Sequence, residues 1–186
     1  MGKLILVTGG ARSGKSTFAE ELVKKNGKKV LYIATANDFD DEMKHRIKKH
    51  KEQRPTTWET LEAFKDFDNI LNKHIADKDV VILDCITIMV ANIMYEGCDD
   101  WNNMTIMEID KMEVMVNKEI SSLIGVIREG NIPFILVTNE IGMGVVPEFP
   151  SGRVFRDIAG RVNQSLAKAA DEVYLCVSGI PVKIKG

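Results

Sequence analysis

The sequence has no apolar run that approaches the roughly 20 residues needed to cross a bilayer. It also has no marked excess of one charge, because 25 Lys and Arg residues stand against 27 Asp and Glu residues, for a formal net charge of −2. A chain this balanced lacks the basic surplus that is typical of nucleic-acid-binding proteins. We therefore expect neither insertion into a membrane nor a nucleic-acid partner.

Cysteine is scarce as well. The three thiols are Cys85, Cys98 and Cys176, and none of them forms a C-x-x-C pair, which disfavours zinc and thioredoxin-like sites. The first apolar stretch is too short for a secretory signal. An odd number of cysteines in a chain without such a signal points to reduced thiols, so we expect the protein in the cytoplasm.

What is present is the composition of a globular protein, and its 186 residues, 45% hydrophobic and 28% charged, predict a single domain over 1–186. Short, nearly continuous apolar runs alternate with longer helical segments, which is typical of an α/β fold with a mostly parallel central sheet flanked by helices. The expected strands are Leu4–Thr8, Val30–Ala34, Val80–Asp84, Phe134–Thr138, Val173–Val177 and Val182–Ile184. The expected helices are Lys15–Lys25, Asp41–Gln53, Leu61–Ile75, Met107–Arg128 and Val154–Ala170, and the expected loops are Gly97–Asn103 and Gly142–Gly152.

Ligands of open α/β sheets bind at the carboxyl ends of the strands. The first expected strand runs into a glycine-rich sequence that fits the phosphate-binding pattern G-x-x-x-x-G-K-[ST]. Its residues are Gly9, Gly10, Ala11, Arg12, Ser13, Gly14, Lys15 and Ser16. Backbone N–H groups of such a turn, together with the N-terminus of the following helix, surround phosphate oxygens. A glycine-rich turn with a chance lysine is the structural alternative.

Within this motif we expect Lys15 to reach the β and γ phosphates and the Ser16 hydroxyl to ligate Mg²⁺. A metal-bound nucleotide also needs a carboxylate at the end of another strand, and Asp84, which closes an apolar run, is the candidate. The alternative is that Asp84 caps the next helix. Glu140 follows a third strand. It either supports the metal-binding residues or contacts the substrate, and the alternative is a charge at a helix N-terminus.

His50 is the candidate nucleophile. On a helix it shares a stripe with Met43, Ile47 and Arg54, so a structural histidine at the end of an amphipathic helix is the alternative. A neutral imidazole can attack phosphorus. Lys51 and Arg54 beside it are placed to balance the phosphate charge.

These residues resemble the bifunctional adenosylcobinamide kinase / adenosylcobinamide-phosphate guanylyltransferase family of cobalamin biosynthesis, over almost the whole chain. The phosphate-binding turn is shared by many NTPases, whereas its combination with the histidine element and the run at 156–164 is specific. The resemblance rests on Leu6–Ser16, Tyr32–Thr35, Asp40–Met43, His50, Arg54-Pro55, Trp58, Glu62, Asp84–Thr87, Val137–Glu140, Gly142–Gly144, Phe155–Asp157 and Gly160–Gln164.

The resemblance implies a RecA-like P-loop NTPase fold, a homotrimer and two activities. ATP or GTP phosphorylates the aminopropanol hydroxyl of adenosylcobinamide, and GTP then donates GMP to adenosylcobinamide phosphate, which gives adenosylcobinamide-GDP and pyrophosphate. The guanylylated histidine of the family falls on His50, and Lys49 stands where some relatives carry a second histidine.

Two further residues are candidates for contacts with the nucleotide. Guanine needs an acceptor for its N1–H and N2–H donors, and Glu62 is either that acceptor or a solvated helix residue. Thr35 at the end of the second strand either touches the nucleotide or caps the next helix. Neither the corrinoid-binding residues nor the preferred donor of the kinase step follows from the sequence, and the methionines of Met89–Met115 fit a core or subunit interface better than a corrinoid-binding face.

Two other functions fit the phosphate-binding turn. One is a small-molecule kinase with a single activity, in which His50 is structural and no covalent nucleotide forms. The other is a RecA-like, NTP-dependent assembly module without a small-molecule substrate, whose oligomerisation depends on nucleotide.

Overall fold

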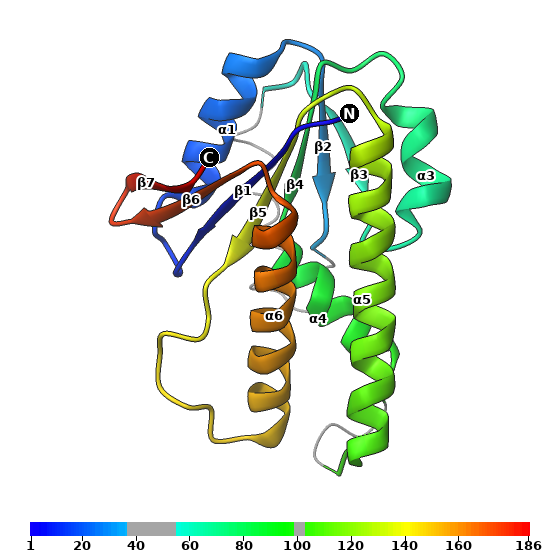
Figure 1. Ribbon diagram of the computed structural model, residues 1–186, viewed down its shortest axis with the longest axis vertical. Coiled ribbons are helices and arrows are strands. Elements are labelled where there is room, and N and C mark those ends of the chain that lie inside the picture. Colours follow the sequence, from blue (N-terminus) through cyan, green and yellow to red (C-terminus); the bar gives the residue numbers. More distant parts are fainter. Residues whose placement is uncertain (37–54, 99–102) are drawn as a thin grey trace.

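The computed structural model describes residues 1–36, 55–98 and 103–186 of the chain. Seven strands form one sheet in the order β3-β2-β4-β5-β1-β6-β7, and only β7 runs antiparallel to its neighbour (Figure 1). The strands are β1 Leu4–Gly9, β2 Val30–Ala34, β3 Glu59–Glu62, β4 Val80–Asp84, β5 Phe134–Asn139, β6 Glu172–Val177 and β7 Ile180–Lys185. The helices are α1 Lys15–Asn26, α3 Phe67–His74, α4 Ile86–Glu96, α5 Ile106–Glu129 and α6 Pro150–Ala169.

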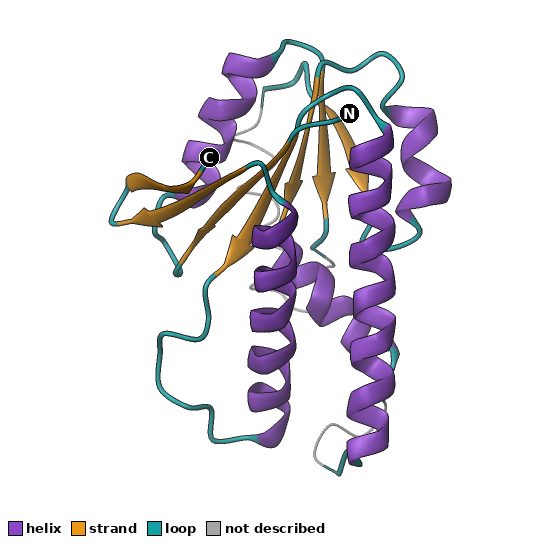
Figure 2. Ribbon diagram, viewed as in Figure 1, coloured by secondary structure: helices purple, strands orange, loops and turns teal. Residues whose placement is uncertain are grey.

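Helices cover both faces of the sheet, with α5 and α6 in front of it and α1 behind it (Figure 2). Successive side chains of β1 point to opposite faces. Leu4 and Leu6 therefore join the core beneath α5 and α6, whereas Ile5 and Val7 pack on the side of α1. All four are buried, which explains why the strand reads as a continuous apolar run rather than as an alternation.

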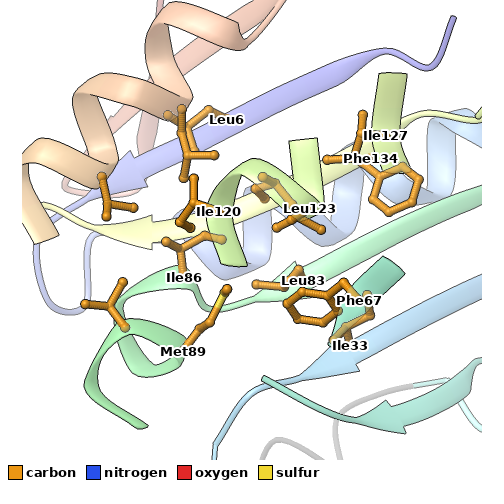
Figure 3. Packing of buried hydrophobic residues seen from close by; sticks show 14 of the residues in the cluster. Leu6, Ile33, Phe67, Leu83, Ile86, Met89, Ile120, Leu123, Ile127 and Phe134 are labelled. Carbon is orange, nitrogen blue, oxygen red and sulfur yellow. The ribbon is translucent and has the colours of Figure 1, made fainter. Parts of the chain in front are cut away.

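The larger core lies between the sheet and α5 (Figure 3). Helix α5 begins at a capping box, in which the Thr105 hydroxyl accepts the Glu108 N–H and the Glu108 carboxylate accepts the Thr105 N–H. Its buried side chains recur every three or four residues, among them Ile120, Leu123 and Ile127. Burial of each such side chain stabilises the fold by about 1.5–3 kcal/mol.

Strand β5 lies between β1, which leads into the glycine-rich turn, and β4, which ends in Asp84. This order, in a mostly parallel sheet flanked by helices, confirms the predicted α/β, RecA-like P-loop fold. All six predicted strands are present, each within two residues of its predicted bounds. The predicted helix Asp41–Gln53 lies outside the described residues.

Two predictions about the elements are wrong, and one helix was not predicted. Residues 61–75 do not form one helix, because the short polar strand β3 ends at Glu62 and α3 begins only at Phe67. Helix α4 was not predicted, since it is apolar nearly all round and lacks the amphipathic period. Helix α6 begins at Pro150, inside the predicted loop; proline at the first helical position is a signal that favours this start.

Candidate functional site

The glycine-rich turn connects β1 to α1 at the carboxyl edge of the sheet. Its backbone bends sharply, because Arg12 and Gly14 have φ angles of 55° and 87° and the Ser13 N–H bonds back to the Gly10 carbonyl at 3.3 Å. Gly14 is the N-cap of α1, and no side chain caps that helix. The first N–H groups of α1 are thereby left for an anion, in a backbone arrangement suited to binding phosphate.

Two glycines of the turn are required by close contacts. A Cβ atom on Gly9 would lie 2.5 Å from Ser13 Oγ and 2.6 Å from the Cys176 carbonyl oxygen. A Cβ atom on Gly14 would lie 2.9 Å from Gly179 Cα, on the turn between β6 and β7. The turn is therefore enclosed by protein on these sides, and larger residues would distort it.

Two polar side chains of the turn are available to a phosphate. The Lys15 ammonium donates a hydrogen bond to the Gly10 carbonyl at 3.1 Å, so the lysine folds back over the loop. Ser13 is buried, and within the described part of the chain its hydroxyl has no hydrogen-bond partner. Because an unpaired buried hydroxyl is costly, a phosphate oxygen would satisfy it.

Asp84 ends β4 and is half-buried. Its carboxylate accepts a hydrogen bond from the Tyr32 hydroxyl at 3.1 Å. The alternative role as a helix cap is wrong, because the N-cap of α4 is Cys85 and no side chain caps that helix. Asp84 is therefore free of a capping role at the edge where the glycine-rich turn begins.

The Asp84 carboxylate and the Ser16 hydroxyl are hard oxygen donors, and Mg²⁺ in nucleotide sites is held by one or two such protein ligands together with phosphates and water. The residues present fit that donor set. Among residues 1–36, 55–98 and 103–186, no group of three or more His, Cys, Asp or Glu side chains is arranged to hold a metal by itself. The phosphates would therefore have to complete the coordination.

Thr35 lies directly after β2 and is buried. Its hydroxyl donates to the Cys85 carbonyl and accepts from the Cys85 N–H, both at 2.8 Å. The Thr35 carbonyl in turn accepts from Asn92 Nδ2 at 2.7 Å. Thr35 thus ties β2 to the residue that follows Asp84, which is a positioning role that the sequence did not indicate.

Glu62 ends β3, and its backbone pairs with Ala34 of β2. Ala34 also pairs with Asp84 on the other side. The interpretation of Glu62 as a solvated helix residue is wrong, since the residue is exposed at the end of an edge strand. Its contact with guanine stays a prediction, and its position at the same edge as Asp84 is compatible with it.

His50, Lys51 and Arg54 lie outside the described residues. The chain enters their segment from the end of β2, beside Asp84, and returns from it at Pro55, just ahead of β3. The segment that carries the candidate nucleophile therefore starts from the edge of the sheet at which the glycine-rich turn lies.

A polar network that the sequence did not predict fixes the end of β5. The Thr87 hydroxyl accepts the Asn139 N–H at 2.7 Å and lies 3.2 Å from the Thr138 hydroxyl. The Thr138 hydroxyl donates to Asn163 Oδ1 at 2.7 Å, and Asn163 Nδ2 donates to the Asn139 carbonyl at 3.0 Å. The network joins α4 and α6 to the strand between β1 and β4.

Glu140 follows that strand. Its N–H donates to the Gly9 carbonyl at 3.0 Å, and its carboxylate accepts the Gly142 N–H at 2.7 Å. The alternative of a charge at a helix N-terminus is wrong, because the next helix begins only at Pro150. Glu140 instead holds the loop after β5 against the start of the glycine-rich turn.

A cysteine nucleophile is not available next to this site. Burial, and then the charge of Asp84, raises the pKa of the Cys85 thiol to about 12. The thiol is therefore protonated at neutral pH, and the thiolate is the reactive form. Cys85 is therefore not a candidate for the nucleophile.

Comparison with known proteins settles the family. The model of the cobinamide kinase / cobinamide phosphate guanyltransferase family matches residues 5–184. The chain belongs to this family. It is 48% identical to the bifunctional adenosylcobalamin biosynthesis protein CobU of Escherichia coli (strain K12), over 98% of this chain and 99% of that protein. It is 49% identical to the protein of the same name from Salmonella typhimurium (strain LT2), over 98% and 99% of the two chains.

Among solved structures, the RadB recombinase aligns with a TM-score of 0.46 and 17% identity, over 93% of this chain and 73% of that one. Membership of the cobinamide kinase / cobinamide phosphate guanyltransferase family confirms the prediction of an enzyme of cobalamin biosynthesis with both activities. It leaves the two alternative functions without support. In the described part of the chain, no helix has the length and apolar character to cross a membrane.

The family motif at 156–164 has a definite place in the structure. It lies on α6 and contributes Arg156, Asp157, Gly160, Arg161, Asn163 and Gln164 to the lining of a cleft of about 540 Å³. Thr8 and Glu140 line the same cleft, and both adjoin Gly9. The most specific run of the sequence therefore shares a cleft with two neighbours of the first glycine of the turn.

Proposed function

We propose that this enzyme phosphorylates the aminopropanol hydroxyl of adenosylcobinamide with ATP or GTP, and then transfers GMP from GTP to the new phosphate. The observation that carries the proposal is the common edge of the sheet. The glycine-rich turn with Lys15 and the acid Asp84 lie there, and the segment of His50 departs from it. A phosphate cradle at the edge from which the segment of the candidate nucleophile departs suits a two-step enzyme.

In the kinase step, Lys15 and the backbone N–H groups of the turn would hold the triphosphate and balance its charge. The substrate hydroxyl attacks the γ-phosphorus and loses its proton to solvent, and the bond to the nucleoside diphosphate breaks. Such transfers need positioning and charge stabilisation more than covalent help. Ser16 and Asp84 would hold Mg²⁺, which when bound neutralises charge on the β and γ phosphates.

In the transferase step, a nitrogen of the His50 imidazole attacks the α-phosphorus of GTP, and pyrophosphate leaves. An oxygen of adenosylcobinamide phosphate then attacks the same phosphorus, and the bond to His50 breaks. Two in-line displacements replace one difficult step. Lys51 and Arg54 would stabilise the charge at the α-phosphate, and Glu62 is our candidate acceptor for the N–H donors of guanine.

The experiment that tests this scheme is covalent labelling with α-³²P-GTP. We expect label that is labile to acid and stable to base, as for a phosphoramidate, and we expect its loss in His50→Ala. The control is His74→Ala, because His74 lies on α3 and bonds to the Glu59 carboxylate at 2.8 Å, away from the turn. Retention of full label in His50→Ala would reject His50 as the nucleophile.

We also propose that the enzyme is a homotrimer in the cytoplasm, as the family resemblance implies. Exposed apolar side chains support an interface between subunits. They are Met143, Val145, Val146 and Phe149 in the loop before α6, and Ile180, Val182 and Ile184 in β7. Light scattering should give a mass of three times the 20.8 kDa of the chain, whereas the monomer mass would reject the trimer.

A further inference from the structure

The turn between β6 and β7 touches the glycine-rich turn, although about 165 residues of sequence lie between them. Val177 pairs with Ile180, so Ser178 and Gly179 form a two-residue hairpin loop, with φ angles of 51° and 84°. The Gly179 N–H donates to the Ser13 carbonyl at 2.9 Å. A Cβ atom on Gly14 would lie 2.9 Å from Gly179 Cα, so the two backbones are in direct contact.

This hydrogen bond fixes the plane of one peptide group. Ser13 and Gly14 are joined by a trans peptide, in which the carbonyl and the N–H point in opposite directions. With the Ser13 carbonyl directed at Gly179, the Gly14 N–H is directed away from the hairpin. It thus joins the free N–H groups at the start of α1, where the first helical bond runs from the Phe18 N–H to the Gly14 carbonyl.

The hairpin itself is held in place from two sides. Strand β6 pairs with β1 up to Cys176 opposite Gly9, the first residue of the turn. On the other side, the Tyr174 ring packs edge-on against Phe18 of α1, with ring centroids 5.0 Å apart. Both ends of the glycine-rich turn therefore share a rigid frame with the hairpin, and the Ser178-Gly179 loop is fixed relative to them.

We propose that Gly179 is a positioning residue for phosphate binding: its N–H holds the Ser13–Gly14 peptide so that the Gly14 N–H is directed at a phosphate oxygen of the nucleoside triphosphate. Gly179 acts through the loop and touches no substrate. The proposal rests on the assignment of Gly9–Ser16 to nucleotide binding. Preorganisation of this kind raises affinity because less ordering remains to be done on binding.

A backbone N–H can be removed by chemical ligation. Cys176 is a native ligation site, so a synthetic peptide of residues 176–186 can be joined to a recombinant thioester of residues 1–175 in denaturant and the full chain refolded. An ester in place of the Ser178–Gly179 amide removes the one donor and leaves the side chains unchanged. The reference is the all-amide chain made by the same route.

The readout is the affinity for the α,β-methylene analogue of GTP in the presence of Mg²⁺, by calorimetry, because this analogue cannot transfer GMP. Loss of one hydrogen bond that orders the loop should weaken binding by about 3- to 10-fold. The control is an ester at the Lys185–Gly186 amide, beyond the last strand, and it should stay within about twofold of the reference.

The outcomes separate this inference from the proposed function. Lys15→Ala in the all-amide chain tests the assignment of the phosphate site, and unchanged affinity there would reject that assignment. If Lys15→Ala weakens binding while the Gly179 ester binds like the reference, the assignment stands and the positioning role is overturned. A lower melting temperature of the ester with unchanged affinity also overturns the positioning role, because a purely structural bond affects stability alone.

Discussion

The Tyr32 hydroxyl donates a hydrogen bond to the Asp84 carboxylate at 3.1 Å, across two adjacent strands of the sheet. Tyr32 is buried, and its ring stacks on Trp58 with centroids 6.4 Å apart. The contact restrains one carboxylate oxygen of Asp84 and, with it, the orientation of the whole carboxylate. Residues that orient a metal-binding group often matter nearly as much as the group itself.

Tyr32→Phe should therefore weaken metal binding without disrupting the fold. The substitution removes the hydrogen bond to Asp84 and keeps the ring that stacks on Trp58. We expect the Mg²⁺ concentration for half-maximal nucleotide binding to rise about 3- to 10-fold. A change of this size corresponds to the loss of one hydrogen bond to a charged group. Titration of Mg²⁺ against a fluorescent GTP analogue measures it, and Trp58 fluorescence reports on the stacked pair.

The matched control for that substitution is Tyr95→Phe on α4, where the side chain is largely exposed. It should leave the Mg²⁺ titration unchanged. If Tyr32→Phe also leaves the titration unchanged, the hydrogen bond does not orient Asp84 for the metal.

The strands of this fold are readable from the sequence because their residues are apolar on both faces. Val80–Asp84, for example, is a short run of buried β-branched and aliphatic residues that ends in an acid. A run of that length and composition is typical of a strand covered on both faces and is too short for a buried helix. The same feature placed the glycine-rich turn and Asp84 at one edge, because parallel strands share the direction of their carboxyl ends.

The parts that the sequence did not reveal depend on tertiary contacts. Strand β3 consists of Glu-Thr-Leu-Glu, and only its pairing with β2 makes it a strand. Thr35 is one polar residue among many until its partner Cys85 is known. The contact between Gly14 and Gly179 joins two glycines that are remote along the chain, and nothing in the local pattern around either residue indicates the other.

Thr35→Val should destabilise the enzyme strongly, although the substitution hardly changes the size of the side chain. Valine has nearly the shape of threonine but can neither accept the Cys85 N–H nor donate to the Cys85 carbonyl, and both groups are buried. A buried backbone group left without its partner costs about 1–3 kcal/mol, so we expect the free energy of unfolding to fall by about 2–4 kcal/mol. Urea denaturation measures the change.

The control is Thr56→Val, since Thr56 is exposed in the turn ahead of β3 and should change stability by less than about 0.5 kcal/mol. A Thr35→Val protein as stable as the control would show that the bonds to Cys85 contribute little. If stability falls while the affinity for nucleotide stays unchanged, Thr35 has no part in the placement of the edge residues.

The stability of the sheet next to the glycine-rich turn should depend on pH through Glu172. Hydrogen bonds from Lys3 and then from Tyr174 lower the pKa of this carboxyl to about 2 from an ordinary 4.5. A lowered pKa means that the stabilisation is complete above about pH 4.5 and is lost as the pH falls toward 2. Glu172→Gln should therefore lower the free energy of unfolding at pH 7 by about 1 kcal/mol. The effect is small because the ion pairs of Glu172 with Lys3 and Lys183 are partly exposed to solvent. The difference should shrink between pH 4.5 and 3, as measured by denaturation at each pH.

The control is Glu129→Gln, because Glu129 is exposed. The opposite outcome is that the free energies of unfolding of Glu172→Gln and the unmodified protein differ by the same amount from pH 7 to pH 3. That result would show that the charge of Glu172 contributes nothing to stability.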